Sequence, residues 1–316
     1  MNLSARIEQA RSLCQEALTD SYIAQAEHFF ARRGLTEQAR IDLLHASAQS
    51  DKATPQLLAL RDSLESESGL AADTGVFERA LLVRAAVSAI DQISELPVDE
   101  SVKHLYCKEL AFYAKPPESA HSHFSLQAYP FIAMSKIVLL KSFPAGPTHW
   151  EISGFPRSWL VKVAPQFMAR TYQFLALKTR GFKPFFVPHL AATRHKQPFL
   201  IEREYLAAFY RAAIALEKQP PIKALMAGSW LHSVETHRVS PHLSFMNRPY
   251  IEAGGIYTDL GPAGPNDGFL DGSKERTELY YAGKYKPTFG VVMCTSKQAI
   301  AWKRAHPEIE PQLTVK

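Results

Sequence analysis

The side chains best suited to chemistry follow an apolar run in the C-terminal half of the chain. His232, Glu235 and His237 stand within six positions of one another. Histidine titrates near neutrality and a positioned carboxylate accepts protons, so His232 and Glu235 are both candidate general bases. We expect Trp230, His237 and Tyr257 to line a substrate pocket beside them.

The same cluster raises the alternative of a metal site. Zinc accepts nitrogen and oxygen ligands, and His232, His237, His242 and Glu235 could supply them. Their five-residue spacing matches no zinc-protease pattern, and the three cysteines form no CxxC pair. We therefore expect no metal and unreactive, buried cysteine thiols. Metal-dependent hydrolysis ranks third among the functional hypotheses.

Charge divides the chain into two regions of opposite sign. Residues 1–115 hold 12 Lys/Arg against 17 Asp/Glu, whereas residues 116–316 hold 24 against 14. The basic residues are dispersed and form no recognised module, so we expect no nucleic-acid partner. No apolar run approaches the 20 or so residues of a membrane span. The N-terminus lacks a signal peptide, and the expected location is the cytoplasm.

Helical periodicity runs through residues 1–115. Apolar residues from Leu3 to Leu18 repeat at helical spacing, and we expect the helix to continue to Gly34. Further helix starts are marked by Thr36, Thr54 before Pro55, Thr74 and Asp99. Short connections between these helices predict an all-helical N-terminal bundle.

Composition changes after residue 115, where prolines and aromatic residues become frequent and apolar runs shorten to strand length. The expected strands are Phe131–Phe143, Trp150–Val163, Phe182–Leu190, Ile222–Leu231, Gly255–Leu260 and Pro287–Thr295. The expected helices are Pro165–Arg180, Ile201–Lys218, His242–Glu252 and Lys274–Gly283. This alternation predicts an α/β (α+β) fold over residues 116–316, a mixed sheet with covering helices. Dinucleotide-binding, Walker A and α/β-hydrolase motifs are absent from the sequence.

One stretch resembles a known family. Residues 278–285 read Glu-Leu-Tyr-Tyr-Ala-Gly-Lys-Tyr and precede the strand Thr288–Met293. They are similar to a late helix–strand element of GNAT-type acyl-CoA N-acyltransferases, in which a helix carrying Leu-Tyr ends at a Gly-aromatic pair. Arg170-Thr171-Tyr172 and Arg180-Gly181-Phe182 echo the pattern earlier in the chain. The resemblance covers at most residues 165–295.

The resemblance implies an acyltransferase-like sheet and acyl-CoA, or a similar thioester, as cosubstrate. An amine or hydroxyl on a small molecule would accept the acyl group. Tyr280 would protonate the departing thiolate. Family members usually hold the cofactor's pyrophosphate at a glycine-rich loop that opens a helix. The loop after Phe182–Leu190 offers Arg194, His195 and Lys196 for that role but no glycine.

Two registers stay open. If Phe182–Leu190 is the strand that separates at the cofactor, Arg194 belongs to the phosphate loop. If Ile222–Leu231 is that strand, the loop runs from His232 to Val239. The first functional hypothesis is an acyltransferase-like enzyme with Tyr280 as acid and with Glu235 or His232 as base. The second is a non-catalytic binding or assembly protein on the same fold, since the glycine-rich loop is missing.

Overall fold

The computed structural model of the 316-residue chain describes residues 1–69, 75–115, 129–190, 201–264, 267–271 and 273–313. The described residues divide into two compact units, an N-terminal one that ends at Pro144 and a C-terminal one that begins at Ala145. The expected order, helical region first and mixed α/β region second, is confirmed. The predicted boundary at residue 115 borders residues outside the described ranges and stays a prediction.

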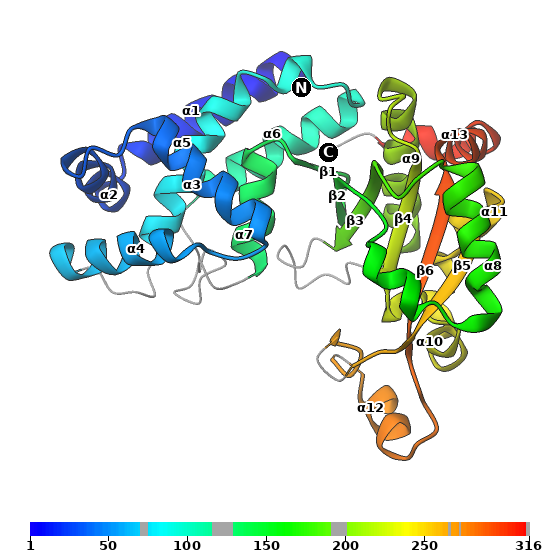
Figure 1. Cartoon of the computed structure of the whole chain (residues 1–316). Helices are drawn as coiled ribbons and strands as arrows, with labels where there is room; N and C mark the ends of the chain where they lie inside the picture. Colours follow the sequence, from blue (N-terminus) through cyan, green and yellow to red (C-terminus); the bar gives the residue numbers. More distant parts are fainter. Residues whose placement is uncertain (70–74, 116–128, 191–200, 265–266, 272, 314–316) are drawn as a thin grey trace. The chain divides into compact units, whose positions relative to one another are not determined.

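Helices make up almost all of the described N-terminal unit (Figure 1). They are α1 (Leu3–Leu18), α2 (Ser21–Arg32), α3 (Glu37–Ser50), α4 (Pro55–Ser68), α5 (Val76–Ile90), the 3-10 turn η2 (Ile93–Glu95), α6 (Glu100–Ala114) and α7 (Tyr129–Val138), followed by the strand β1 (Ser142–Pro144). Side-chain caps define several helix starts. Asn2, Asp20, Thr36, Thr54 and Asp99 each accept a hydrogen bond from a first-turn backbone N–H.

Two expectations for this unit are wrong. The first helix ends at Leu18 and does not reach Gly34, because Asp20 caps a new helix, α2. Most of the expected strand Phe131–Phe143 is helix α7, which packs against α3 and α5. A run of apolar residues fits a helix that is surrounded by other helices as well as it fits a strand.

The centre of the bundle is α5, which is buried along nearly its whole length. A charged network lies beside it. Glu27 of α2 holds two arginines, with Arg40 Nη1 2.9 Å from Oε1 and Arg84 Nη2 2.9 Å from Oε2. Because the Glu27 carboxylate is only 18% exposed, these bonds are shielded from water and link α2, α3 and α5.

The C-terminal unit is a twisted sheet with helices on both faces (Figure 1). Its strands are β2 (Thr148–Ser153), β3 (Phe185–Leu190), β4 (Ala224–Ser229), β5 (Ile256–Pro262) and β6 (Thr288–Thr295), in the order β2-β3-β4-β6-β5. Only β3 and β4 are parallel; the other neighbours are antiparallel. The mixed sheet predicted from the sequence is confirmed.

Helical segments connect these strands. They are the 3-10 helix η3 (Arg157–Lys162), α8 (Pro165–Gln173), the π-helical turn η4 (Phe174–Lys178), α9 (Glu202–Lys218), η5 (Trp230–His232), α10 (Val234–Val239), η6 (Pro241–Met246), α11 (Arg248–Glu252), α12 (Lys274–Tyr281), α13 (Ser296–Ala305) and η8 (Pro307–Leu313). The expected strand Trp150–Val163 is wrong beyond Ser153, because Gly154 and Pro156 precede η3. The expected helix His242–Glu252 is two short pieces.

Each face of the sheet has its own apolar cluster. On one face, Phe185 of β3 and Met226 of β4 pack with residues from η3 and α8, including half-buried Trp159. On the other face, Tyr205 of α9 packs with Leu231 and the half-buried Leu190. We call the first the η3 face.

Candidate functional site

The parallel strands β3 and β4 part after their first two residues. Their register pairs Phe185 with Ala224 and Phe186 with Leu225, and it covers no later residue of either strand. Both strands are fully described and both continue for four more residues. They therefore separate toward their carboxyl ends, where ligands of open α/β sheets usually bind.

The outer edges of the two strands remain fully paired. All six residues of β3 pair with β2, and all six residues of β4 pair with β6. The sheet thus consists of two continuous halves, β2-β3 and β4-β6-β5, that are joined at one end. Main-chain N–H and C=O groups on the two inner edges lie beyond the reach of the ladder, and such groups need a partner. Pro188 lies in the separated half of β3, and proline is tolerated in a strand where its nitrogen needs no partner.

A histidine pair and a carboxylate lie on the separated half of β3 and the adjacent strand β2. His149 of β2 stands directly opposite His189 of β3, so both side chains point to the same face. Glu151 stands opposite Val187, which packs into the cluster on the η3 face, and this places all three side chains on that face. His189 Nε2 lies 3.1 Å from Glu151 Oε1, an ion-pair distance without the alignment of a hydrogen bond.

The two imidazoles differ in burial. His149 is 6% exposed, and its Nε2 has no hydrogen-bond partner among the described residues. Burial, with a smaller contribution from His189, lowers the pKa of His149 to about 4, so its ring is neutral at physiological pH. The His189 side chain is 34% exposed, and the Glu151 side chain is 17% exposed. The His189 side chain is thus half-buried, with its Nε2 buried beside Glu151, whereas His149 is almost fully enclosed.

Two aromatic rings pack against β4 where this strand separates from β3. Gly228 of β4 stands four residues beyond Ala224, at the level of His189 and on the same face. A Cβ at Gly228 would lie 3.0 Å from Phe289 Cε1 and 3.4 Å from Trp159 Cη2. The Trp159 and Phe289 rings meet edge to face with centroids 5.3 Å apart. The absence of a side chain at Gly228 lets these rings approach the strand where it leaves β3.

His232, a base candidate from the sequence, lies at the end of β4 in η5. It is 3% exposed, and its Nδ1 is 2.6 Å from Asn247 Oδ1. Burial lowers the pKa of His232 to about 4. In its present position the ring is neutral and enclosed by protein.

Three other predicted residues lie close to His232 along the turn that follows β4. His237 Nε2 is 2.8 Å from the Leu231 carbonyl oxygen, and Glu235 accepts a hydrogen bond from the Arg238 guanidinium at the surface. The Trp230 ring is covered by the Arg276 guanidinium, whose carbon is 5.0 Å from the ring centroid. The structure thus gathers Trp230, His232, Glu235 and His237 in one turn, with most of their polar atoms bonded within the protein.

Tyr280 and Tyr257 lie in other surroundings. Tyr280 of α12 packs edge to face on Phe269, 5.0 Å between centroids. Tyr257 of β5 donates its hydroxyl hydrogen to Asp259 Oδ2 at 3.2 Å, and burial raises its pKa to about 12. The phosphate-loop candidates Arg194, His195 and Lys196 lie outside the described residues. Their roles stay predictions.

His149, Glu151 and His189 were not among the site residues predicted from the sequence. A signal was present, because Thr148–Ser153 alternates and places His149 and Glu151 on one face of a strand. The sequence does not show how β2 pairs with β3, and it is this pairing that places His149 beside His189, forty residues further along the chain. Among the described residues, no group of three or more His, Cys, Asp or Glu side chains is arranged to hold a metal ion.

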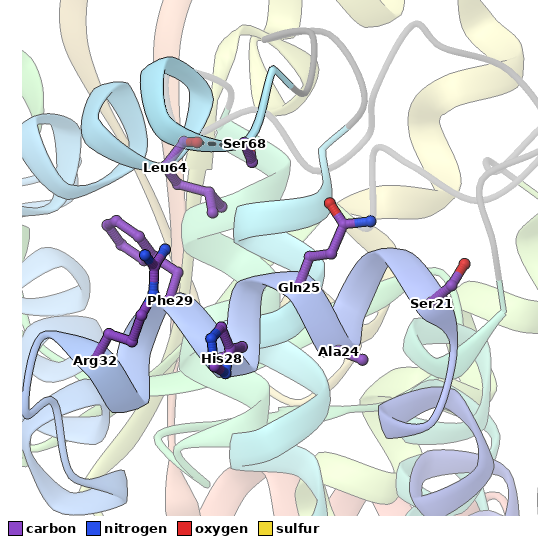
Figure 2. Close-up of a pocket in the computed structure, with 8 residues that line it drawn as sticks. All are labelled: Ser21, Ala24, Gln25, His28, Phe29, Arg32, Leu64 and Ser68. Atoms are coloured by element: carbon purple, nitrogen blue, oxygen red, sulfur yellow. Dashed lines mark hydrogen bonds between the residues drawn. The ribbon is translucent and has the colours of Figure 1, made fainter.

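A separate groove lies on the N-terminal unit between α2 and α4 (Figure 2). It has a volume of about 420 Å³, with Phe29 and Leu64 as its floor and Gln25, His28 and Arg32 along its rim. The Arg32 guanidinium forms an ion pair with Glu67, with Nη2 3.2 Å from Oε2.

No described helix of the chain is long and apolar enough to cross a membrane.

Comparison with known proteins gives a distant structural match. No protein-family model and no curated protein matches the sequence. Two solved acyltransferase structures are similar in fold. One, in complex with decanoyl-CoA and teicoplanin, has a TM-score of 0.43 at 9% identity, over 69% of this chain and 66% of that one. The other, with decanoyl-CoA, has a TM-score of 0.35 at 12% identity, over 75% and 62%. This chain covers less than two thirds of either.

Proposed function

We propose that the protein transfers an acyl group from a coenzyme A-type thioester to an amine or hydroxyl acceptor. The observation that carries the proposal is the separation of β3 from β4 after two residue pairs, with each strand still fully paired on its other edge. This geometry leaves two main-chain edges facing each other across a space that no strand of the described chain occupies.

The pantetheine arm of coenzyme A suits such a space. It is extended and carries two amide groups, which can donate to and accept from a strand edge as an added strand does. An extended ligand between β3 and β4 would satisfy main-chain groups that the sheet itself leaves unpaired. The separated strands are also what the resemblance to GNAT-type enzymes leads us to expect, and both alternatives for the register named one of these two strands.

Charge favours a ligand with phosphates. Residues 152–201 contain eight Lys/Arg and no Asp/Glu. Arg194 and Lys196 belong to this stretch and follow β3 directly in sequence, before α9. A basic segment at the carboxyl end of β3 raises the local concentration of an anionic cofactor. We propose that these residues, with His195, bind the phosphates.

The residues that the sequence pointed to for catalysis remain part of the proposal, Tyr280 through the resemblance and Glu235 and His232 through their side-chain chemistry. Tyr280 would protonate the departing thiolate, and Glu235 or His232 would act as base. Replacing Tyr280 by Phe should slow turnover and leave the fold intact, since the phenyl ring keeps its contact with Phe269. Unchanged turnover in Tyr280→Phe would remove Tyr280 from the mechanism.

Binding of coenzyme A tests the proposed function. We expect calorimetric titration with CoA and acetyl-CoA to give saturable binding, and either ligand to raise the melting temperature. Gly228→Val places a side chain against Phe289 and Trp159 where the strands part, and should weaken CoA binding at least about tenfold.

Gly264→Val is the matched control. Among the described residues, a Cβ at Gly264 would meet the Asp267 carboxylate at 3.7 Å, an ordinary van der Waals distance, so the same atoms are added without a clash. We expect Gly264→Val to bind CoA as the wild type does. Absence of CoA binding at millimolar ligand, or equal affinity in Gly228→Val and wild type, would contradict the proposal. Binding without any acyl transfer would favour a non-catalytic binding protein.

A further inference from the structure

We propose that His189 is the base that takes the proton from the acceptor nucleophile, and that Glu151 and His149 are its positioning residues. The inference rests on the proposed function, because it assigns a role at the same separation of strands. In this assignment His189 replaces His232 and Glu235, the base candidates from the sequence, which lie after β4 and bond to Asn247 and Arg238.

The position of His189 supports the role. It is the fifth of the six residues of β3, well beyond the last pair with β4, and its side chain is on the η3 face. Gly228, at the same level on β4, presents no side chain of its own on that face. A thioester held between the strands would therefore have an imidazole on one side and the rings of Trp159 and Phe289 on the other.

Glu151 is the acidic side chain that the described structure places beside the His189 ring. Glu151 Oε1, 3.1 Å from His189 Nε2, stabilises the imidazolium that forms when the ring accepts a proton. On the neighbouring strand the facing group is His149, which is neutral because burial lowers its pKa to about 4. Across the separation the neighbours are Gly228, Trp159 and Phe289, which carry no charge. Among the described residues, Glu151 is the charged side chain within ion-pair distance of the His189 ring.

His149 adds a second, independent observation. The residue is more than nine-tenths buried, and its Nε2 has no partner among the described residues, an arrangement that costs free energy in the absence of a ligand or water. It stands directly across from His189, so its ring limits where the His189 imidazole can turn. A buried, neutral ring in this position restricts the half-buried His189 imidazole without repelling the imidazolium.

The chemical step balances without a further reactant. The lone pair of a neutral amine attacks the thioester carbonyl carbon, and a C–N bond forms. The C–S bond breaks, and the thiolate leaves with the electron pair. His189 takes the proton from the attacking nitrogen and returns it to solvent, while the thiolate takes a proton from Tyr280 or from solvent.

The test compares His189→Gln and Glu151→Gln with wild type and with His28→Gln, which alters an exposed histidine of α2. The substrates are acetyl-CoA and a panel of primary amines, and release of the free thiol measures turnover. CoA affinity and melting temperature are measured for every variant, so that loss of fold or of donor binding is detected separately.

We expect His189→Gln to lose about 100- to 10,000-fold in kcat, the usual contribution of a general base, with CoA affinity unchanged. The acid limb of the pH profile of kcat/KM should disappear, and imidazole added to His189→Gly should restore part of the rate. Glu151→Gln should lower kcat and leave KM for acetyl-CoA unchanged, and His28→Gln should match wild type.

The outcomes separate the two proposals. If wild type neither binds CoA nor releases thiol, the proposed function fails. If wild type is active and His189→Gln keeps both its rate and its pH profile, the function stands and His189 is not the base. If His189→Gln loses CoA affinity along with its rate, His189 binds the donor, and the inference is wrong.

Discussion

His149→Phe should make the C-terminal unit less sensitive to acid. In the folded chain, burial lowers the pKa of His149 to about 4 from an ordinary value near 6.5. Between these two pH values the unfolded chain binds a proton at His149 and the folded chain does not. The stability that this creates is present above pH 6.5 and is lost as the pH falls toward 4. Proton linkage for this one site, with its folded and unfolded pKa values, gives a loss of about 2 kcal/mol in the free energy of unfolding between pH 7 and pH 5. Phenylalanine fills a similar volume and cannot be protonated.

Tryptophan fluorescence during urea unfolding is the appropriate assay, because all four tryptophans belong to the C-terminal unit. The free energy of unfolding of wild type should fall between pH 7 and pH 5 by about 2 kcal/mol more than that of His149→Phe. His28→Gln, which alters an exposed histidine of the other unit, should follow wild type. Equal acid sensitivity in wild type and His149→Phe would refute the assignment of a buried neutral imidazole to His149.

Three further predictions concern stability and reactivity. Glu27→Gln removes the charge that two arginines share and should cost the N-terminal unit about 2 kcal/mol in urea unfolding followed by circular dichroism, whereas the exposed Glu16→Gln should cost nothing measurable. Gly290→Ala places a Cβ 2.7 Å from a backbone carbonyl oxygen and should destabilise the C-terminal unit by roughly 2 kcal/mol, an effect that Gly264→Ala should not share. Burial raises the pKa of all three cysteine thiols, so the folded protein should react with a thiol reagent at pH 8 far more slowly than the denatured protein; one fast-reacting thiol in the folded state would contradict this.

Local signals predicted the helix starts well. Thr54 before Pro55 and Asp99 before Glu100 cap α4 and α6 as expected, because a cap depends only on residues within one turn. The run that begins at Phe131 shows the limit of such signals. Its residues alone suit a strand, and α7 forms because neighbouring helices cover it on the bundle side.

The candidate site was harder to predict because its residues come together only through the pairing of strands that are far apart in the sequence. His149 and His189 become neighbours only through the pairing of β2 with β3, and the separation from β4 depends on where that pairing ends. The cluster around His232, by contrast, is contiguous in sequence and drew attention for that reason. In the structure its polar atoms largely bond to the protein itself, as with His232 and Asn247.

The two-pair junction between β3 and β4 has a mechanical consequence. Each half of the sheet is a continuous ladder, but across the junction only two residue pairs and the flanking helices resist relative motion. We therefore expect any relative motion of the two halves to occur at this junction. A ligand that fills it would act as a missing strand and stiffen both halves. Slower amide exchange at Val187, His189 and Leu190 and across Met226–Ser229 would record that stiffening.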